Sequence, residues 1–177
     1  MHIEKNVCDI ILGTVMNTKG KTKDNMKSLL DLHAMQIRTE LHPVQRGDKL
    51  ELPRASYSLS WNQIEVLCKF VRDLQVPDGL SSNTSHSVNL KERKILGLKS
   101  HDCHILLQCR LPLAFHGLIP NCEPLIGLSM FFNVLYAKSL KVADLEQIKR
   151  QISRTLSKFE RCLLHLALIL CCIYLFI

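Results

Sequence analysis

His101, Asp102, Cys103 and His104 form the densest cluster of chemically versatile side chains in the sequence. Imidazole nitrogens and thiolates are donors that zinc accepts, and His101 and His104, three residues apart, share one face of a helix. A zinc site needs three or four converging ligands. The further ligands would have to come from residues whose positions match no known ligand spacing, namely Cys109, His116 and Cys122. We therefore expect capping, hydrogen-bonding or packing roles for His101, Cys103 and His104, and no metal or other cofactor.

Nucleophilic catalysis and base stacking are the other chemistries that single residues suggest. No feature of the sequence marks Cys103 as an activated thiol, so it is not expected to be a nucleophile. Trp61 and Tyr57 could stack on nucleic acid bases, but single aromatic residues near a helix start more often belong to the core, and we expect that role for both. The sequence has no Gly-rich phosphate loop, nucleophile elbow or internal repeat, and no site for a small-molecule substrate is predicted.

The cluster opens the stretch Leu96–Pro120, around which the rest of the chain is organised. Ser100 is a good N-cap and Asp102 suits the positive end of a helix, so a helix is expected to begin near His101. Pro112 should kink or split this helix because it removes a backbone donor. Steps of three and four residues place one set of side chains on a side that should be buried: Ile105, Leu106, Cys109, Pro112, Leu113 and His116.

Helical spacing of apolar residues predicts most of the remaining chain to be α-helical. Expected helices cover residues 3 to 17, 22 to 38, 60 to 75, 125 to 136 and 144 to 160, with a short one near 90 to 96. The third is the best marked, because Ser60-Trp61-Asn62-Gln63 is a capping box. Residues 42 to 54 read as an extended connector and residues 80 to 87 as a surface loop. The predicted fold is mostly α, an irregular helical fragment with long loops and an apolar C-terminal helix.

Composition narrows the function classes only slightly. The chain has 177 residues, a formal net charge of +7 and eight cysteines. The positive charge permits contact with phosphates of nucleic acid or with an anionic membrane, although the basic residues are scattered. The cysteines form no compact disulfide framework, and Glu4 interrupts the apolar start that a signal peptide would need, so a reducing compartment is expected.

The segment Cys162–Ile177 is apolar throughout except for His165. It is slightly shorter than the ~20 residues of a spanning helix, but an anchor can borrow flanking residues. Basic residues precede it, which favours a cytosolic body by the positive-inside rule. A small tail-anchored membrane protein is therefore the second hypothesis. The residues of the candidate membrane segment are Cys162, Leu163, Leu164, Leu166, Leu168, Ile169, Leu170, Ile173, Leu175, Phe176 and Ile177.

Several long motifs resemble one family of mobile-element proteins. The central stretch LGLKSHDCHILLQCRLPLAFHGLIP resembles a segment of plant CACTA-type (En/Spm-like) transposases. The blocks MHIEKNVCDIILGTVMNTKGKTKDN, LDLHAMQIRTELHPV and VPDGLSSNTSHSVNL resemble other parts of the same region, in the same order. The resemblance extends from Met1 to about Glu160.

The resemblance implies a division into four parts. In such transposases an RNase H-like catalytic domain comes first, and MHIEKNVCD resembles its last helix. Residues 1–40 would be the remnant of that domain, 41–95 a connector with one helix and a Ser/Asn-rich loop, 96–161 the start of the helical domain of unknown function, and 162–177 the apolar tail.

The resemblance also implies a chemistry that this chain should lack. The family cleaves and joins DNA strands with divalent metal ions held by carboxylates, as two-metal sites do. Glu4 is the one candidate for such an acid, and alone it cannot hold a metal pair. We therefore expect a truncated, transposase-like protein that is not an enzyme. Its expected partners are DNA or an intact transposase, in the nucleus, unless the tail inserts in a membrane.

The departure from the family after Glu160 has a simple genetic interpretation. Family members continue with a phrase like Phe-Asp-Ile-Met-Leu-His-Leu-Pro-Ile-His. Written as TTT GAT ATT ATG TTG CAT CTA CCT ATT CAT and read without its first base, this phrase gives the nine residues from Leu168 to Phe176, and the first base of a following Leu codon, TTA, completes the codon of Ile177. The resemblance therefore implies that the tail is a frame-shifted reading of the family sequence, although side chains of this kind still favour apolar surroundings.

Overall fold

The fold is mostly helical, as predicted. The computed structural model describes residues 2–22, 26–36, 39–47, 49–73, 84–120, 122–137, 139 and 141–162, so the predicted apolar C-terminal helix lies outside the described residues from 163 onward. The α-helices are α1 (His2–Val15), α2 (Met26–Ala34), α3 (Trp61–Arg72), α4 (Ser100–Ile105), α5 (Leu111–His116), α6 (Glu123–Leu135) and α7 (Val142–Cys162). Between them lie the 3₁₀ turns η1 (Thr39–Leu41) and η2 (Thr84–Ser87), the π-helical turn η3 (Leu106–Arg110) and the strands β1 (Val44–Arg46), β2 (Lys49–Glu51), β3 (Val88–Asn89) and β4 (Lys94–Ile95).

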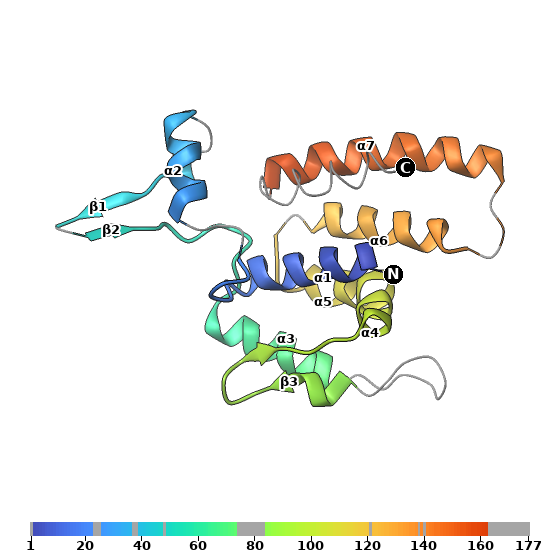
Figure 1. Cartoon of the computed structure of the whole chain (residues 1–177), viewed down its shortest axis with the longest axis horizontal. Helices are drawn as coiled ribbons and strands as arrows, with labels where there is room; N and C mark the ends of the chain where they lie inside the picture. The colour runs from blue at the N-terminus through green and yellow to red at the C-terminus, as the bar shows by residue number, and fades with distance from the viewer. Residues whose placement is uncertain are drawn as a thin grey trace.

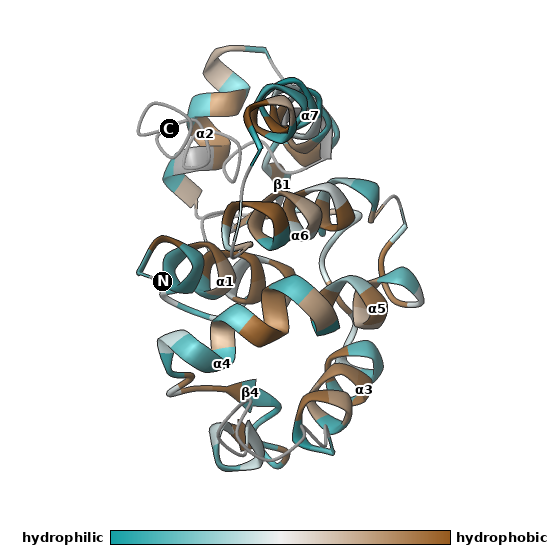
Figure 2. Cartoon of the chain, turned by 90° about the vertical axis from the view of Figure 1, so that its right-hand side faces the viewer, coloured by the Kyte–Doolittle hydropathy of each residue, from teal (hydrophilic) through white to brown (hydrophobic). Residues whose placement is uncertain are grey.

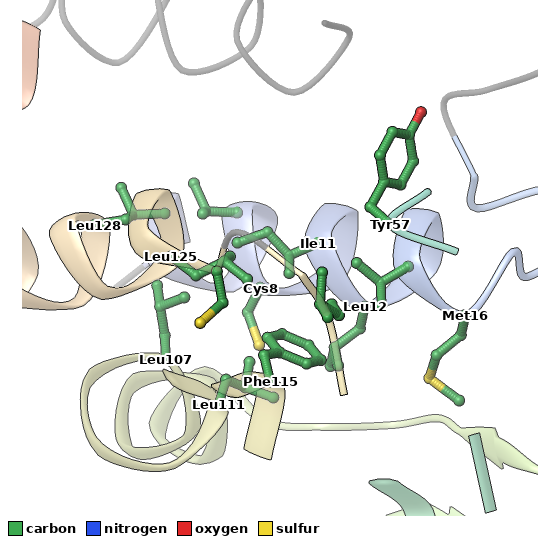
Figure 3. Packing of buried hydrophobic residues seen from close by; sticks show 14 of the residues in the cluster. Cys8, Ile11, Leu12, Met16, Tyr57, Leu107, Leu111, Phe115, Leu125 and Leu128 are labelled. Atoms are coloured by element: carbon green, nitrogen blue, oxygen red, sulfur yellow. The ribbon is translucent and has the colours of Figure 1, made fainter. Parts of the chain in front are cut away.

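Helix α1 lies at the centre of the helical body. In Figure 1 it runs beside α6 and lies against α4, with α7 on the far side of α6, α3 and the β3–β4 hairpin below, and α2 with the β1–β2 hairpin standing to one side. Cys8, Ile11 and Leu12 of α1 point toward the side chains of η3, α5 and α6 (Figure 3). Burial of such side chains contributes about 1.5–3 kcal/mol each, so the helix is held chiefly by this face.

The central stretch forms one helical rod with a widened turn in its middle. The backbone N–H of Leu111 donates to the carbonyl of Leu106, five residues earlier, and Pro112 follows in the first turn of α5. The predicted interruption at Pro112 is therefore confirmed. The helix begins at Ser100, one residue before the expected start, and Lys99 is the N-cap, with its backbone N–H donating to Asp102 Oδ2 at 2.9 Å.

The predicted buried side of the central stretch is wrong beyond Leu106. Leu113, Cys109 and His116 are exposed, whereas Leu107, Leu111 and Phe115 are fully buried. A π-helical turn contains an additional residue, which rotates the following residues around the axis relative to a regular α-helix. The buried side therefore continues at steps of four residues, through Leu107, Leu111 and Phe115.

The predicted capping box at the start of α3 is present. Ser60 Oγ accepts a hydrogen bond from the backbone N–H of Gln63, and the Gln63 side chain accepts one from the backbone N–H of Ser60 at 2.8 Å. Leu59 N–H donates to the Val15 carbonyl at 2.9 Å, which ties the connector to the end of α1. The start of α3 is thus fixed beside the C-terminal turn of α1.

Two short β-hairpins form in segments that were expected to be an extended connector and a short helix. The extended connector forms the antiparallel pair β1–β2, with Gln45 opposite Leu50. The short helix predicted near 90 to 96 is wrong, because this segment contains the turn of the β3–β4 hairpin, in which Val88 lies opposite Ile95. Arg93 closes this turn with φ +50°, a left-handed conformation that no α-helix contains.

The outer helices bury their apolar faces largely as expected. Ile148, Ile152, Leu156 and Phe159 of α7 are buried. A Cβ placed on Gly127 of α6 would lie 2.5 Å from Thr155 Oγ1, so the absence of a side chain there lets α6 and α7 approach closely. For α2 the spacing predicts Met26, Leu29, Leu30, His33 and Ile37 on one side, and this is partly wrong: Leu29 and Leu32 are buried, Met26, Leu30 and His33 are exposed, and Ile37 lies outside the described residues.

Candidate functional site

Glu4, the candidate metal-binding acid, lies inside the protein. It occupies the first turn of α1 and its exposed fraction is 0%. It falls on the same face as the buried residues Val7, Cys8 and Ile11. A buried carboxylate is stable only when hydrogen-bond donors or a positive charge replace its water. The structure supplies these from the central stretch, about a hundred residues further along the chain.

Both oxygens of the Glu4 carboxylate are occupied. His104 Nδ1 lies 2.9 Å from Oε2 and 3.1 Å from Oε1, and Gln108 Nε2 donates to Oε1 at 2.8 Å. An ionised carboxylate only accepts hydrogen bonds, so this pairing requires the tautomer of His104 that has a proton on Nδ1. His104 Nδ1 and Gln108 Nε2 are 3.0 Å apart because both donate to Glu4, and not because they bond to each other.

Two aromatic side chains surround this cluster. The rings of His104 and Tyr136 meet edge to face with centroids 5.3 Å apart, and His101 stacks on His104 at 6.3 Å. Burial, and then the negative charge of Glu4, raise the pKa of Tyr136. The arrangement fixes the start of α1 on α4 and η3, and leaves no oxygen of Glu4 directed at solvent.

Of the predicted zinc candidates, His101 and His104 lie side by side on α4 and Cys103 lies on its buried side. Cys103 is fully buried and contacts Cys8, whereas His101 is exposed and His104 faces Glu4. A hydrogen bond with Cys103, followed by burial, raises the pKa of Cys8 well above its usual value. His116 and Cys122 do approach each other, with Nδ1 and Sγ 3.7 Å apart, while Cys109 is exposed. In the described part of the chain, no three His, Cys, Asp or Glu residues are arranged to hold a metal ion.

The two aromatic candidates have different environments. Tyr57 is buried in the core, as expected. Trp61 is 68% exposed, so the expectation that it belongs to the core is wrong. It is the first residue of α3, and its side chain lies at the protein surface.

The outer face of α7 is the most continuous basic surface among the described helices. Lys149, Arg150, Arg154 and Lys158 are exposed on it. Lys158 pairs with Glu123 of α6, whereas the other three have no acidic partner within the described ranges. Figure 2 shows the hydrophilic colour of α7 on the side turned away from α6. In the sequence these four residues are among the basic residues that precede the apolar tail. Lys149 and Arg150 are adjacent, and Arg154 and Lys158 follow at steps of four residues.

Comparison with known proteins finds no relative of this chain. No protein-family model, curated protein or solved structure matches this chain.

Proposed function

We propose that this chain is a transposase-like protein of the CACTA type that acts through contact with DNA, or with an intact transposase, and not through catalysis. The long motifs of the sequence support the family assignment. One structural observation carries the non-catalytic role: Glu4, the acid that the resemblance offers as a metal ligand, is fully buried and bonded to His104 and Gln108. A carboxylate with no exposed surface cannot reach a metal ion in an open site.

The basic face of α7 supports DNA as the partner. Lys149, Arg150 and Arg154 are exposed on α7, a helix of 21 residues, and have no acidic partner among the residues that the structure describes. Positive side chains that replace counterions on the phosphate backbone give affinity without sequence recognition and with strong salt dependence. The face therefore fits duplex DNA through its backbone.

The test is a triple variant, Lys149→Gln, Arg150→Gln and Arg154→Gln, of the full chain. Binding to a duplex of about 30 base pairs is measured by fluorescence anisotropy between 50 and 200 mM salt. We expect the variant to bind every sequence more weakly. The slope of the logarithm of affinity against the logarithm of salt concentration should become smaller by about three, since each lost phosphate contact lowers it by about one. The control variant, Lys27→Gln, Lys91→Gln and Lys99→Gln, changes the net charge equally at other exposed sites. Equal losses in the two variants would contradict a site on α7.

The apolar tail favours one alternative, a tail-anchored protein whose basic helical body faces the cytosol. No helix in the described ranges combines the length and apolar character needed to cross a bilayer. The tail itself lies outside those ranges, and α7 places its basic residues directly before it.

Alkaline extraction of cells that express the chain with an N-terminal tag tests this alternative. A tail anchor predicts that the full chain stays in the membrane pellet after carbonate treatment, while a variant that ends at Cys162 is released. Release of both proteins would rule out the anchor and leave the DNA-contact proposal in place.

A further inference from the structure

A basic groove lies on the opposite side of the core from α7. It is a hollow of about 410 Å³ between the turn after α1, the connector, the start of α3 and the β3–β4 hairpin. Lys19, Arg54, Arg93 and Lys94 line it, together with Trp61 and Glu92. Its volume is in the range of pockets that hold small molecules.

The groove carries more positive charge than its own acids neutralise. Lys94 pairs with Glu92 at 2.8 Å, and Arg93 pairs at 3.1 Å with Glu65 of α3. Lys19 and Arg54 have no acidic partner within the described ranges, and Arg54 Nη2 is held by a hydrogen bond to the Ser58 carbonyl at 2.7 Å. Two cations are therefore free to bind an anion.

Trp61 gives the groove an aromatic wall. The Arg93 guanidinium lies 5.5 Å from the centroid of the ring, a cation–π contact that covers one face. The residue is nevertheless 68% exposed, so the opposite face and the edges are open. A large exposed indole is uncommon, and a ring fixed on one face by a cation is preorganised to receive a flat partner on the other.

One buried atom at this site lacks an internal partner. Arg93 Nε is buried and has no hydrogen-bond partner among the described residues. The positive φ angles of the lining residues Asn17 and Arg93, 48° and 50°, follow from the local fold, because Asn17 ends α1 and Arg93 closes the β3–β4 turn. Buried polar atoms without a partner are rare in native proteins, so Arg93 Nε is a free donor beside the groove.

We propose that this groove binds a nucleoside phosphate, with the base stacked on the open face of Trp61 and the phosphate held by Lys19 and Arg54. The nucleotide is either free or part of a single-stranded nucleic acid, because the two share this chemistry. Stacking on an aromatic ring beside cations that follow the backbone is how single strands are bound without sequence preference. The proposal does not depend on duplex binding by α7.

The intrinsic fluorescence of Trp61 tests the proposal directly, because it is the only tryptophan in the chain. The full chain is titrated with AMP, with a single-stranded oligonucleotide of ten adenylates, and with inorganic phosphate. We expect saturable quenching by AMP or the oligonucleotide and none by phosphate. Quenching by AMP assigns the site to a free nucleotide, and quenching by the oligonucleotide alone assigns it to a single strand. Absence of quenching by both overturns the proposal.

Three variants and one control locate the site. Binding is measured by anisotropy of a fluorescein-labelled form of whichever probe quenches. We expect Trp61→Ala to weaken binding about tenfold, and Lys19→Gln and Arg54→Gln to weaken it severalfold with a smaller salt dependence. The residues are exposed, so the variants should fold normally. Lys27→Gln removes an exposed charge on α2 and should not change the affinity. If none of the three site variants lowers the affinity more than Lys27→Gln does, the assignment is overturned. Because the α7 triple variant retains the groove, loss of duplex binding and loss of nucleotide binding are separable results.

Discussion

Replacing Glu4 with alanine is expected to lower the free energy of unfolding by about 3 kcal/mol, since the loss of one member of a buried pair leaves the others unpaired. The change removes the acceptor for His104 Nδ1 and Gln108 Nε2, and it leaves a cavity at the start of α1. His104 is partly exposed and can regain water, which keeps the effect at the lower end of the range for buried pairs. Urea unfolding of the full chain, followed by circular dichroism, measures it.

A surface acid and a double-mutant cycle provide the controls. Glu123→Ala removes the exposed partner of Lys158 and should leave the unfolding midpoint unchanged. In the double variant Glu4→Ala, His104→Ala the two losses should be less than additive by at least ~1 kcal/mol, because the residues share one interaction. Full stability of Glu4→Ala would mean that the carboxylate is not engaged, and would restore Glu4 as a candidate metal ligand.

Leu111→Ala should destabilise the protein by about 2–5 kcal/mol, the usual cost of removing a buried leucine side chain. Leu111 is 1% exposed, and it packs with Phe115 against α1 (Figure 3). Leu113→Ala, two residues away in the same helix, should change the stability by less than ~0.5 kcal/mol, because Leu113 is 67% exposed. Thermal unfolding of both variants measures the difference. The opposite order would show that the central stretch is a regular helix with the face that the sequence pattern predicts.

Local signals predicted the elements well, because they depend on neighbouring residues. The capping box at Ser60 and the interruption at Pro112 are both decided within one helical turn. The β3–β4 hairpin was missed because its left-handed residue is Arg93 and not glycine, and because the turn-forming side chain of Asn89, which accepts a hydrogen bond from the Glu92 N–H at 3.1 Å, was not recognised as a signal. The face of the central stretch was missed because a widened turn at η3 changes the phase of every later residue.

The candidate sites depend on contacts that spacing along the chain does not reveal. Glu4 and His104 are a hundred residues apart, so the pairing could not be predicted. One signal was present: Glu4 precedes Val7 and Ile11 by three and seven residues, which places an acid on the buried face of α1. The groove is lined by four separate segments of the chain. In the sequence its one sign was Trp61, a possible base-stacking residue that was expected to lie in the core.

The central claim, contact with DNA without catalysis, is tested most directly by incubating the full chain with supercoiled plasmid in the presence of Mg²⁺ or Mn²⁺. The account predicts retarded plasmid that returns to its original supercoiled form when the protein is removed, with binding that weakens as salt increases. Nicked, linear or joined DNA that requires the metal ion, and that is lost in Glu4→Gln, would contradict the account.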